Sequence, residues 1–165
     1  LVPAEVSSNL SRYDGVKYGH YSEGAKTLSE RYLQSRDQGF GAEAKRRILI
    51  GTYVLSSGYY DAYYKRAQKV RTKLIDEFTA AFKNVDILVG PTTPGTAFKL
   101  GEKINDPISM YLEDIMTVAA NLVGVPAMSV PAGEIGGLPI GAQLFADQTH
   151  ENLLFEAAKV VESAS

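Results

Sequence analysis

Three consecutive cations, Lys45, Arg46 and Arg47, come directly before the wholly apolar stretch 48–50. On a helix, this order places one of the three close to the buried side. The planar guanidinium of an arginine there can hold a carboxylate or a phosphate through two parallel hydrogen bonds, which a lysine ammonium does less well. Because most Lys and Arg side chains are exposed, a solvated basic turn is the alternative interpretation.

Asp114 is the last charged residue before a charge-free stretch that runs over 115–133. It lies in a segment predicted to be helical, on the same strip as Met110, Thr117 and Asn121. Because burial of an unpaired carboxylate is very unfavourable, an acid at this position is solvated, paired or bound to a ligand. One interpretation is an exposed residue beside its acidic neighbour. The other is a carboxylate directed into a pocket.

Aromatic and cationic side chains alternate over residues 59–66, Tyr-Tyr-Asp-Ala-Tyr-Tyr-Lys-Arg. Residues 41–75 hold eight Lys and Arg against only Glu43 and Asp61. A basic, aromatic segment of this kind is compatible with RNA contact. Half-buried packing of the tyrosines is the favoured interpretation, because phosphate binding requires one basic face and these cations are spread over several.

Several common catalytic chemistries lack their residues in this sequence. The absence of cysteine excludes disulfides, thiolate metal sites and cysteine nucleophiles. With only His20 and His150, no metal site and no histidine-based triad is expected. The Ser-Ser-Gly run at 56–58 has no paired base, and the glycine-rich run at 133–137 lacks the strand–glycine–helix context of a phosphate loop. We interpret these runs as a helix C-terminus and a turn.

The elements that must position these residues are mainly helical in the first half of the chain. Short helices are predicted at 4–12 and 27–36, followed by helices at 42–57 and 59–83 that Gly58 separates. The last of these carries apolar residues at spacings of three and four, which predicts one buried stripe. The stripe comprises Ala67, Val70, Leu74, Phe78, Ala81 and Phe82.

Strands and helices alternate in the second half. Asp106 and Pro107 provide N-cap and first-turn signals, and the Gly136-Gly137 pair indicates a hairpin. This order is typical of an α/β or α+β layer with a sheet of three or four strands. The expected elements are a strand at 85–89, a Pro-fixed loop at 90–95, a helix at 106–123, strands at 128–130 and 138–145, and a helix at 151–162.

Length and composition set further limits. With 165 residues, 45% hydrophobic and 22% charged, the chain has the size and composition of one folded domain and not of a disordered or fibrous protein. A net charge of −2 gives no overall attraction to nucleic acid or anionic membranes. The charge-free stretch 115–133 is interrupted by Asn, Gly and Pro, so no membrane span is expected. The start Leu-Val-Pro indicates a chain cut from a longer one.

Five segments together resemble one enzyme family, and the resemblance covers essentially the whole chain. They are 7–15 (SSNLSRYDG), 41–48 (GAEAKRRI), 58–64 (GYYDAYY), 90–94 (GPTTP) and 121–126 (NLVGVP). The chain resembles the C-terminal part of the amidase-signature family. More narrowly, its first and third segments resemble the glutaminase subunits of the glutamyl-tRNA(Gln)/aspartyl-tRNA(Asn) amidotransferases.

The resemblance implies an α/β fold, with a mixed sheet flanked by helices, and residues 1–165 as the C-terminal portion of a single amidase domain. The family hydrolyses amides with a nucleophilic serine, a second serine on a cis peptide and a lysine. These groups lie in the first half of the family's chains, and none of them matches a residue of this sequence. We therefore expect no catalytic residue here and no activity from this chain alone.

The resemblance places the substrate-binding residues inside this chain. It implies that Arg47 holds the α-carboxylate of glutamine and that Asp114 holds the α-ammonium, with Thr92 and Thr93 bordering the same pocket. Both main assignments agree with the chemistry, because a planar cation suits a carboxylate and a carboxylate suits an ammonium.

The resemblance also implies a setting for the activity. We expect a cytoplasmic, heterotrimeric ligase complex, with an organelle as the alternative location, in which the glutaminase supplies ammonia for transamidation of Glu-tRNA(Gln) or Asp-tRNA(Asn). No cofactor is expected on this chain, and ATP and Mg²⁺ are expected on the partner subunit, which also handles the charged tRNA. The alternatives are another amide hydrolase of the family, a non-catalytic interaction module and an RNA-contact protein.

Overall fold

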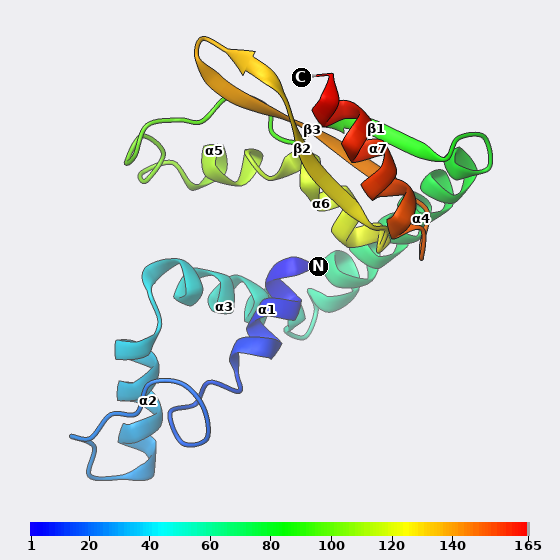
Figure 1. The fold of residues 1–165 in the computed structure, drawn as a ribbon. Coiled ribbons are helices and arrows are strands. Elements are labelled where there is room, and N and C mark those ends of the chain that lie inside the picture. The colour runs from blue at the N-terminus through cyan, green and yellow to red at the C-terminus, as the bar shows by residue number, and fades with distance from the viewer. Residues whose placement is uncertain (165) are drawn as a thin grey trace. The chain divides into compact units, whose positions relative to one another are not determined.

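The computed structural model describes residues 1–164 and divides into two compact units, residues 1–70 and 71–165 (Figure 1). Each unit is described by itself. The boundary falls inside a long helix, so the first unit contains only the beginning of that helix.

The first unit is helical, as the sequence predicts. Thr27 begins the second helix with a complete capping box: its side chain accepts from the Glu30 N–H, and the Glu30 carboxylate accepts from the Thr27 N–H. The helices are α1 (Val2–Leu10), α2 (Leu28–Gly39), α3 (Ala42–Leu55), η1 (Tyr60–Lys65) and α4 (Arg66–Phe82).

One prediction in this region is wrong in detail. The segment 59–83 is not a single α-helix, because its start, η1, is a π-helix. The wider turn accompanies two ring stacks, Tyr59 on Tyr63 with centroids 6.0 Å apart and Tyr60 on Tyr64 at 5.2 Å. Spacings of three and four cannot distinguish an α-helical start from such a π-helical one.

The helices α1 and α3 pack closely because Gly51 has no side chain. A Cβ atom at Gly51 would lie 2.0 Å from the carbonyl oxygen of Pro3 and 2.4 Å from Ser7 Oγ. Ala4 and Ser7 are buried at this contact, and Tyr64 Oη donates to Glu5 Oε1 at 3.0 Å. The first unit is thus held by close backbone approach more than by large apolar side chains.

The second unit contains all three strands. Its expected helix at 106–123 is interrupted, which corrects the prediction of one continuous helix: the backbone leaves the α-helical pattern at Glu113 and Asp114. The remaining elements are β1 (Ile87–Pro91), α5 (Pro107–Leu112), α6 (Ile115–Val123), β2 (Ala127–Ile135), β3 (Leu138–Ala146) and α7 (Glu151–Ser163).

The strands form a sheet in the order β1-β3-β2, and the α/β fold class is confirmed. Both pairings within residues 1–164 are antiparallel, so the described sheet contains no parallel pair. The predicted hairpin is present, with positive φ at Gly136 and Gly137. The strand predicted at 128–130 is longer than expected and continues through Pro131 to Ile135, with a register shift between Pro131 and Glu134.

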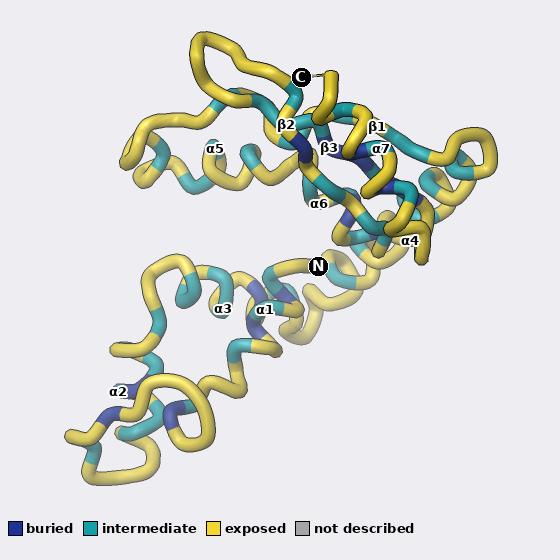
Figure 2. The backbone as a smooth tube through the Cα atoms, in the orientation of Figure 1, coloured by how far each residue is buried: buried dark blue, intermediate teal, exposed yellow. Residues whose placement is uncertain are grey.

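Helices cover the two faces of the sheet differently. Helix α7 packs on the face that carries Val130, Leu144 and Ala146, where Leu154 and Ala158 complete the core (Figures 1 and 2). Because side chains alternate along a strand, Gln143 and Phe145 belong to the opposite face. There, Phe78 of α4 meets Phe145 edge-on at 6.0 Å, and residues of α6 border Gln143.

Candidate functional site

Arg47 is the least exposed of the three consecutive cations of α3. Its side chain is 33% exposed, against 44% for Arg46 and 42% for Lys45. The apolar run that follows is not a buried side in this unit, because Leu49 and Ile50 are exposed. Arg47 Nε donates to Glu43 Oε1 at 2.8 Å, and Arg46 Nη1 donates to Glu43 Oε2 at 2.5 Å. Glu43 therefore orients both guanidinium groups.

Lys45 is held by a different acid. Its ammonium lies 2.6 Å from Asp37 Oδ1 and joins the end of α2 to the start of α3. The hydrogen bond and the charge of Lys45 lower the pKa of Asp37. Together the three cations face two acids, Asp37 and Glu43, so this end of α3 keeps a positive charge that attracts anions.

Asp114 marks the break between α5 and α6. It is the N-cap residue of α6, but its side chain caps none of the helix amides and is exposed. Its backbone carbonyl oxygen instead accepts from both Thr117 N and Thr117 Oγ1 at 3.0 Å. Within its own unit, Asp114 thus matches the exposed interpretation, and its carboxylate is turned to solvent.

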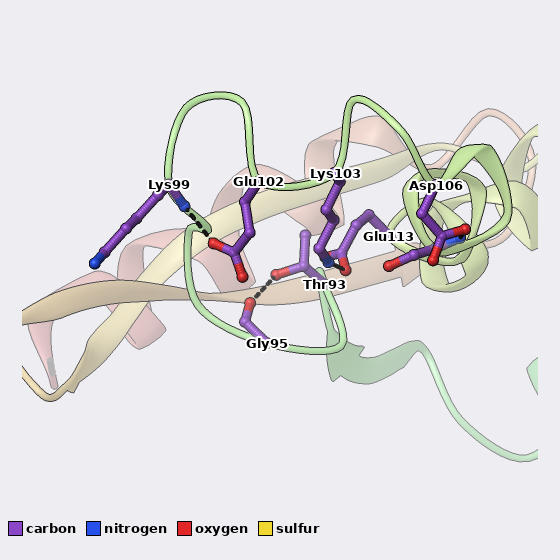
Figure 3. Close-up of polar contacts among 8 residues, drawn as sticks. Thr93, Gly95, Lys99, Glu102, Lys103, Asp106 and Glu113 are labelled. Carbon is purple, nitrogen blue, oxygen red and sulfur yellow. Dashed lines mark hydrogen bonds and ion pairs between the residues drawn. The ribbon is translucent and has the colours of Figure 1, made fainter.

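The acidic neighbour of Asp114 behaves differently. Glu113 is part-buried and forms an ion pair with Lys103, which comes from the loop before α5 (Figure 3). In the same loop, Thr93 Oγ1 donates to the Gly95 carbonyl at 2.7 Å, and Glu102 accepts from the Lys99 N–H at 2.9 Å (Figure 3). These bonds fix the loop locally and tie it to the position just before Asp114.

Thr92 and Thr93 have different surroundings. Thr93 is exposed and closes the turn to Gly95, whereas Thr92 is half-buried on the sheet. Thr92 Oγ1 lies 2.7 Å from Ser129 Oγ, and the Thr92 N–H donates to the Gly141 carbonyl at 3.1 Å. Thr92 is therefore the member of the pair that belongs to the polar face of the sheet.

Sequence reasoning missed a further polar residue on this face, Gln143. It pairs with Ser129 in the β2–β3 register and is only 5% exposed. Its Oε1 atom has no hydrogen-bond partner among residues 1–164. The available signal was a polar residue in the middle of an otherwise apolar strand, which is uncommon unless its polar atoms are satisfied.

A hollow of about 440 Å³ lies between α6 and this face of the sheet. Thr117 and Asn121 contribute from α6, and Gln143 contributes from β3. The hollow is lined by Thr117, Ala120, Asn121, Gly124, Val125, Ala127 and Gln143.

The proposed site residues fall in both units. Arg47 belongs to the first unit, whereas Asp114, Thr92 and Thr93 belong to the second, where Asp114 and the hollow share helix α6. The second unit therefore contains the acid at the start of α6, and the threonine hydroxyl and the buried glutamine on one face of the sheet.

The tyrosine-rich segment matches the favoured packing interpretation only in part: its rings stack on one another, but Tyr53, Tyr59, Tyr60 and Tyr63 stay exposed. Tyr53 lies 4.3 Å from Tyr59 between ring centroids, and the Lys65 ammonium lies 5.6 Å from the Tyr60 ring centroid. The side-chain hydrogen bond with Tyr59 raises the pKa of Tyr53 to about 12. Nearby, the run 56–58 ends a helix, as expected, and Ser56 Oγ donates to the Tyr53 carbonyl.

Metal-binding clusters and membrane-spanning helices are both missing from residues 1–164. Across these residues, no three His, Cys, Asp or Glu side chains gather closely enough to hold a metal ion. The helices described within them are all too short or too polar to cross a membrane.

The chain belongs to the amidase family: the family's sequence model, described as Amidase, matches residues 1–155. Its similar relatives include amidotransferase subunits. The A subunit of the glutamyl-tRNA(Gln) amidotransferase of Koribacter versatilis is 61% identical over 99% of this chain and 34% of its own length. The corresponding protein from Trichodesmium erythraeum is 57% identical over 100% of this chain and 34% of its own length.

A solved structure agrees with this assignment. The crystal structure of the same amidotransferase component from Thermotoga maritima matches with a TM-score of 0.58 and 39% identity, over 93% of this chain and 31% of that one. The chain thus spans about a third of the length of the relatives it matches.

Proposed function

We propose that this chain is the substrate-binding, C-terminal portion of a single amidase domain in a glutamine-dependent amidotransferase subunit. The names of the similar proteins support the reaction class, and the position of Arg47 carries the proposal for this chain. A half-buried, oriented guanidinium at a positively charged helix start has the properties required to bind a carboxylate.

In this proposal, two charged residues hold the two ends of an amino-acid zwitterion. Arg47 binds the α-carboxylate through the planar edge of its guanidinium, while Glu43 keeps that plane fixed through Nε. Asp114 binds the α-ammonium with a carboxylate that is not used for helix capping. The side-chain carboxamide is then directed away from both charges, toward the nucleophile.

The hydrolytic groups belong to the remainder of the subunit. A nucleophilic serine, a second serine and a lysine would attack the carboxamide carbon and release ammonia. This chain contributes binding and orientation, and alone it releases no ammonia.

The ammonia would serve a partner subunit of a heterotrimeric ligase, which amidates Glu-tRNA(Gln) or Asp-tRNA(Asn) in the cytoplasm. ATP and Mg²⁺ would act on that partner, where the tRNA-bound carboxyl group is activated. Glutamine is the substrate of this chain's site, and charged tRNA meets it only through the complex.

The test is ammonia release from glutamine by the complete subunit in its complex. Arg47→Ala should raise KM for glutamine on the order of 30-fold or more, because loss of one partner of a charged pair costs about 2 kcal/mol or more. Arg46→Ala is the matched control, since it removes the other bond to Glu43 but no substrate contact. Equal effects of the two variants would overturn the assignment of Arg47.

A further inference from the structure

Gln143 is the polar side chain of this chain that most clearly requires an outside partner. It lies in the central strand of the sheet, is 5% exposed, and its Oε1 atom accepts no hydrogen bond from residues 1–164. A buried amide oxygen is unfavourable unless a donor meets it. A donor group is therefore expected at this atom in the working protein.

The hollow in front of Gln143 has the size for a small ligand group. Its volume of about 440 Å³ lies within the roughly 300–1,000 Å³ that small-molecule sites occupy. Three small residues, Ala120, Gly124 and Ala127, leave this space open between α6 and the sheet. Gly124, with φ of 79°, ends α6 in a left-handed conformation, and Val125 and Ala127 beyond it still line the hollow.

The polar groups around the hollow favour a ligand group that donates hydrogen bonds over a ligand group with negative charge. Asn121 Nδ2 donates to the Thr117 carbonyl at 2.9 Å, and Thr117 Oγ1 donates to the Asp114 carbonyl, so these donors are used within α6. The carbonyl end of α6 adds partial negative charge. None of the lining residues is charged, so nothing in the lining offsets the charge of a carboxylate.

We infer that this hollow is the subsite for the substrate's side-chain carboxamide, with Gln143 Oε1 accepting an amide N–H. The inference rests on the proposed function and deepens it. Asp114 is the N-cap of α6, and Thr117 in the lining of the hollow lies three residues further along, about 4.5 Å of helix rise. A bound glutamine can therefore place its α-ammonium at Asp114 and its carboxamide over the hollow.

This arrangement makes Gln143 a specificity-determining residue. The substrate and the product of the reaction, glutamine and glutamate, share their α-groups and differ only at the side-chain end. An acceptor oxygen attracts the carboxamide N–H of glutamine and repels the carboxylate of glutamate. Arg47 and Asp114 cannot make this distinction, because both ligands offer them the same groups.

The test uses the complete subunit in its complex and compares KM for glutamine with the competitive Ki of glutamate. Gln143→Met removes the acceptor at nearly constant side-chain volume. It should raise KM for glutamine about tenfold, while the Ki of glutamate stays unchanged or falls. Gln143→Glu keeps an acceptor oxygen and should retain the preference for glutamine. Gln38→Met, at an exposed glutamine that lies outside the lining of the hollow, is the control and should change neither constant.

A ligand-based measurement keeps the inference testable if the variants fold poorly. 5-Oxonorleucine, in which a methyl group replaces the carboxamide NH2, has the shape of glutamine without an N–H donor, so the unmodified enzyme should bind it about tenfold more weakly than glutamine. Equal affinity, or a Gln143→Met variant that loses thermal stability with an unchanged glutamine-to-glutamate ratio, would assign Gln143 to internal packing and overturn the inference. Failure of the proposed function is a separate outcome, in which Arg47→Ala leaves glutamine affinity unchanged.

Discussion

Thr92 Oγ1 and Ser129 Oγ lie 2.7 Å apart, although Ser129 belongs to one outer strand, β2, and Thr92 directly follows the other, β1. Their hydroxyls meet over Gly141 of the central strand β3, where a Cβ atom would lie 2.6 Å from Ser129 Oγ and 2.8 Å from Thr92 Oγ1. The absence of a side chain at Gly141 is therefore what permits this bridge. The bridge fixes Thr92 on the same face as Gln143.

Gly141→Ala should lower the free energy of unfolding by about 1–3 kcal/mol, because overpacking forces the two hydroxyls apart and removes their hydrogen bond. Gly95→Ala is the matched control, since a Cβ atom at Gly95 meets no atom within 4 Å. Urea unfolding of both variants measures the difference. Equal stability of the two variants would contradict the steric role of Gly141.

The pH dependence of stability should report the stacked tyrosines. The hydrogen bond with Tyr59 raises the folded-state pKa of Tyr53 to about 12, above its ordinary value of 10.0. A raised pKa means that the contribution is fully present below pH 10 and is lost as the pH rises toward 12. The stability advantage of the wild type over Tyr53→Phe should therefore shrink across this window.

Urea titrations from pH 9 to 12 measure this advantage. Tyr18→Phe, at an exposed tyrosine outside the stack, is the control. A difference between wild type and Tyr53→Phe that stays constant from pH 9 to 12 would show that the Tyr53 hydroxyl does not stabilise the fold.

Local signals in the sequence predicted most of the elements. Asp106 caps α5 by accepting from the Ser109 N–H at 3.1 Å, and Gly136-Gly137 forms the predicted hairpin turn. The break at Asp114 was not predictable, because it accompanies the ion pair between Lys103 and Glu113, which joins a loop to a helix. Helix periodicity contains no information about such a contact between segments.

The candidate site was only partly predictable for the same reason. The place before an apolar run singled out Lys45, Arg46 and Arg47 together, and only the family resemblance selected Arg47 among them. Its side chain is also less exposed than that of Arg46. Gln143 was missed, because an unsatisfied acceptor depends on where α6 lies over the sheet and not on the residues next to it in the sequence. A buried polar side chain becomes informative only when its hydrogen-bond partners are known.

The chain produced alone should bind a hydrophobic dye and associate. Large apolar side chains are strongly exposed in it, including Leu49, Leu100, Ile104 and Ile108. An apolar hollow of about 420 Å³ also lies along α5 and α6, with Ile108, Tyr111 and Ile115 in its lining. Extensive exposed apolar surface drives association. Sedimentation with dye binding measures this, and a monomer that binds no dye would contradict the expectation.

The central claim is that Arg47 and Asp114 hold opposite ends of glutamine, and ligands that lack one end test it most directly. In the complete subunit, Arg47→Ala should weaken the binding of glutamine on the order of 30-fold or more. It should leave the binding of 4-aminobutanamide unchanged, because this analogue has no α-carboxylate. Asp114→Asn should weaken the binding of glutamine but leave the binding of 4-carbamoylbutanoate unchanged, because this analogue has no α-ammonium. KM for glutamine and Ki for the two analogues give these values. If each variant weakens all three ligands equally, or weakens none, the two residues do not hold the ends of the substrate.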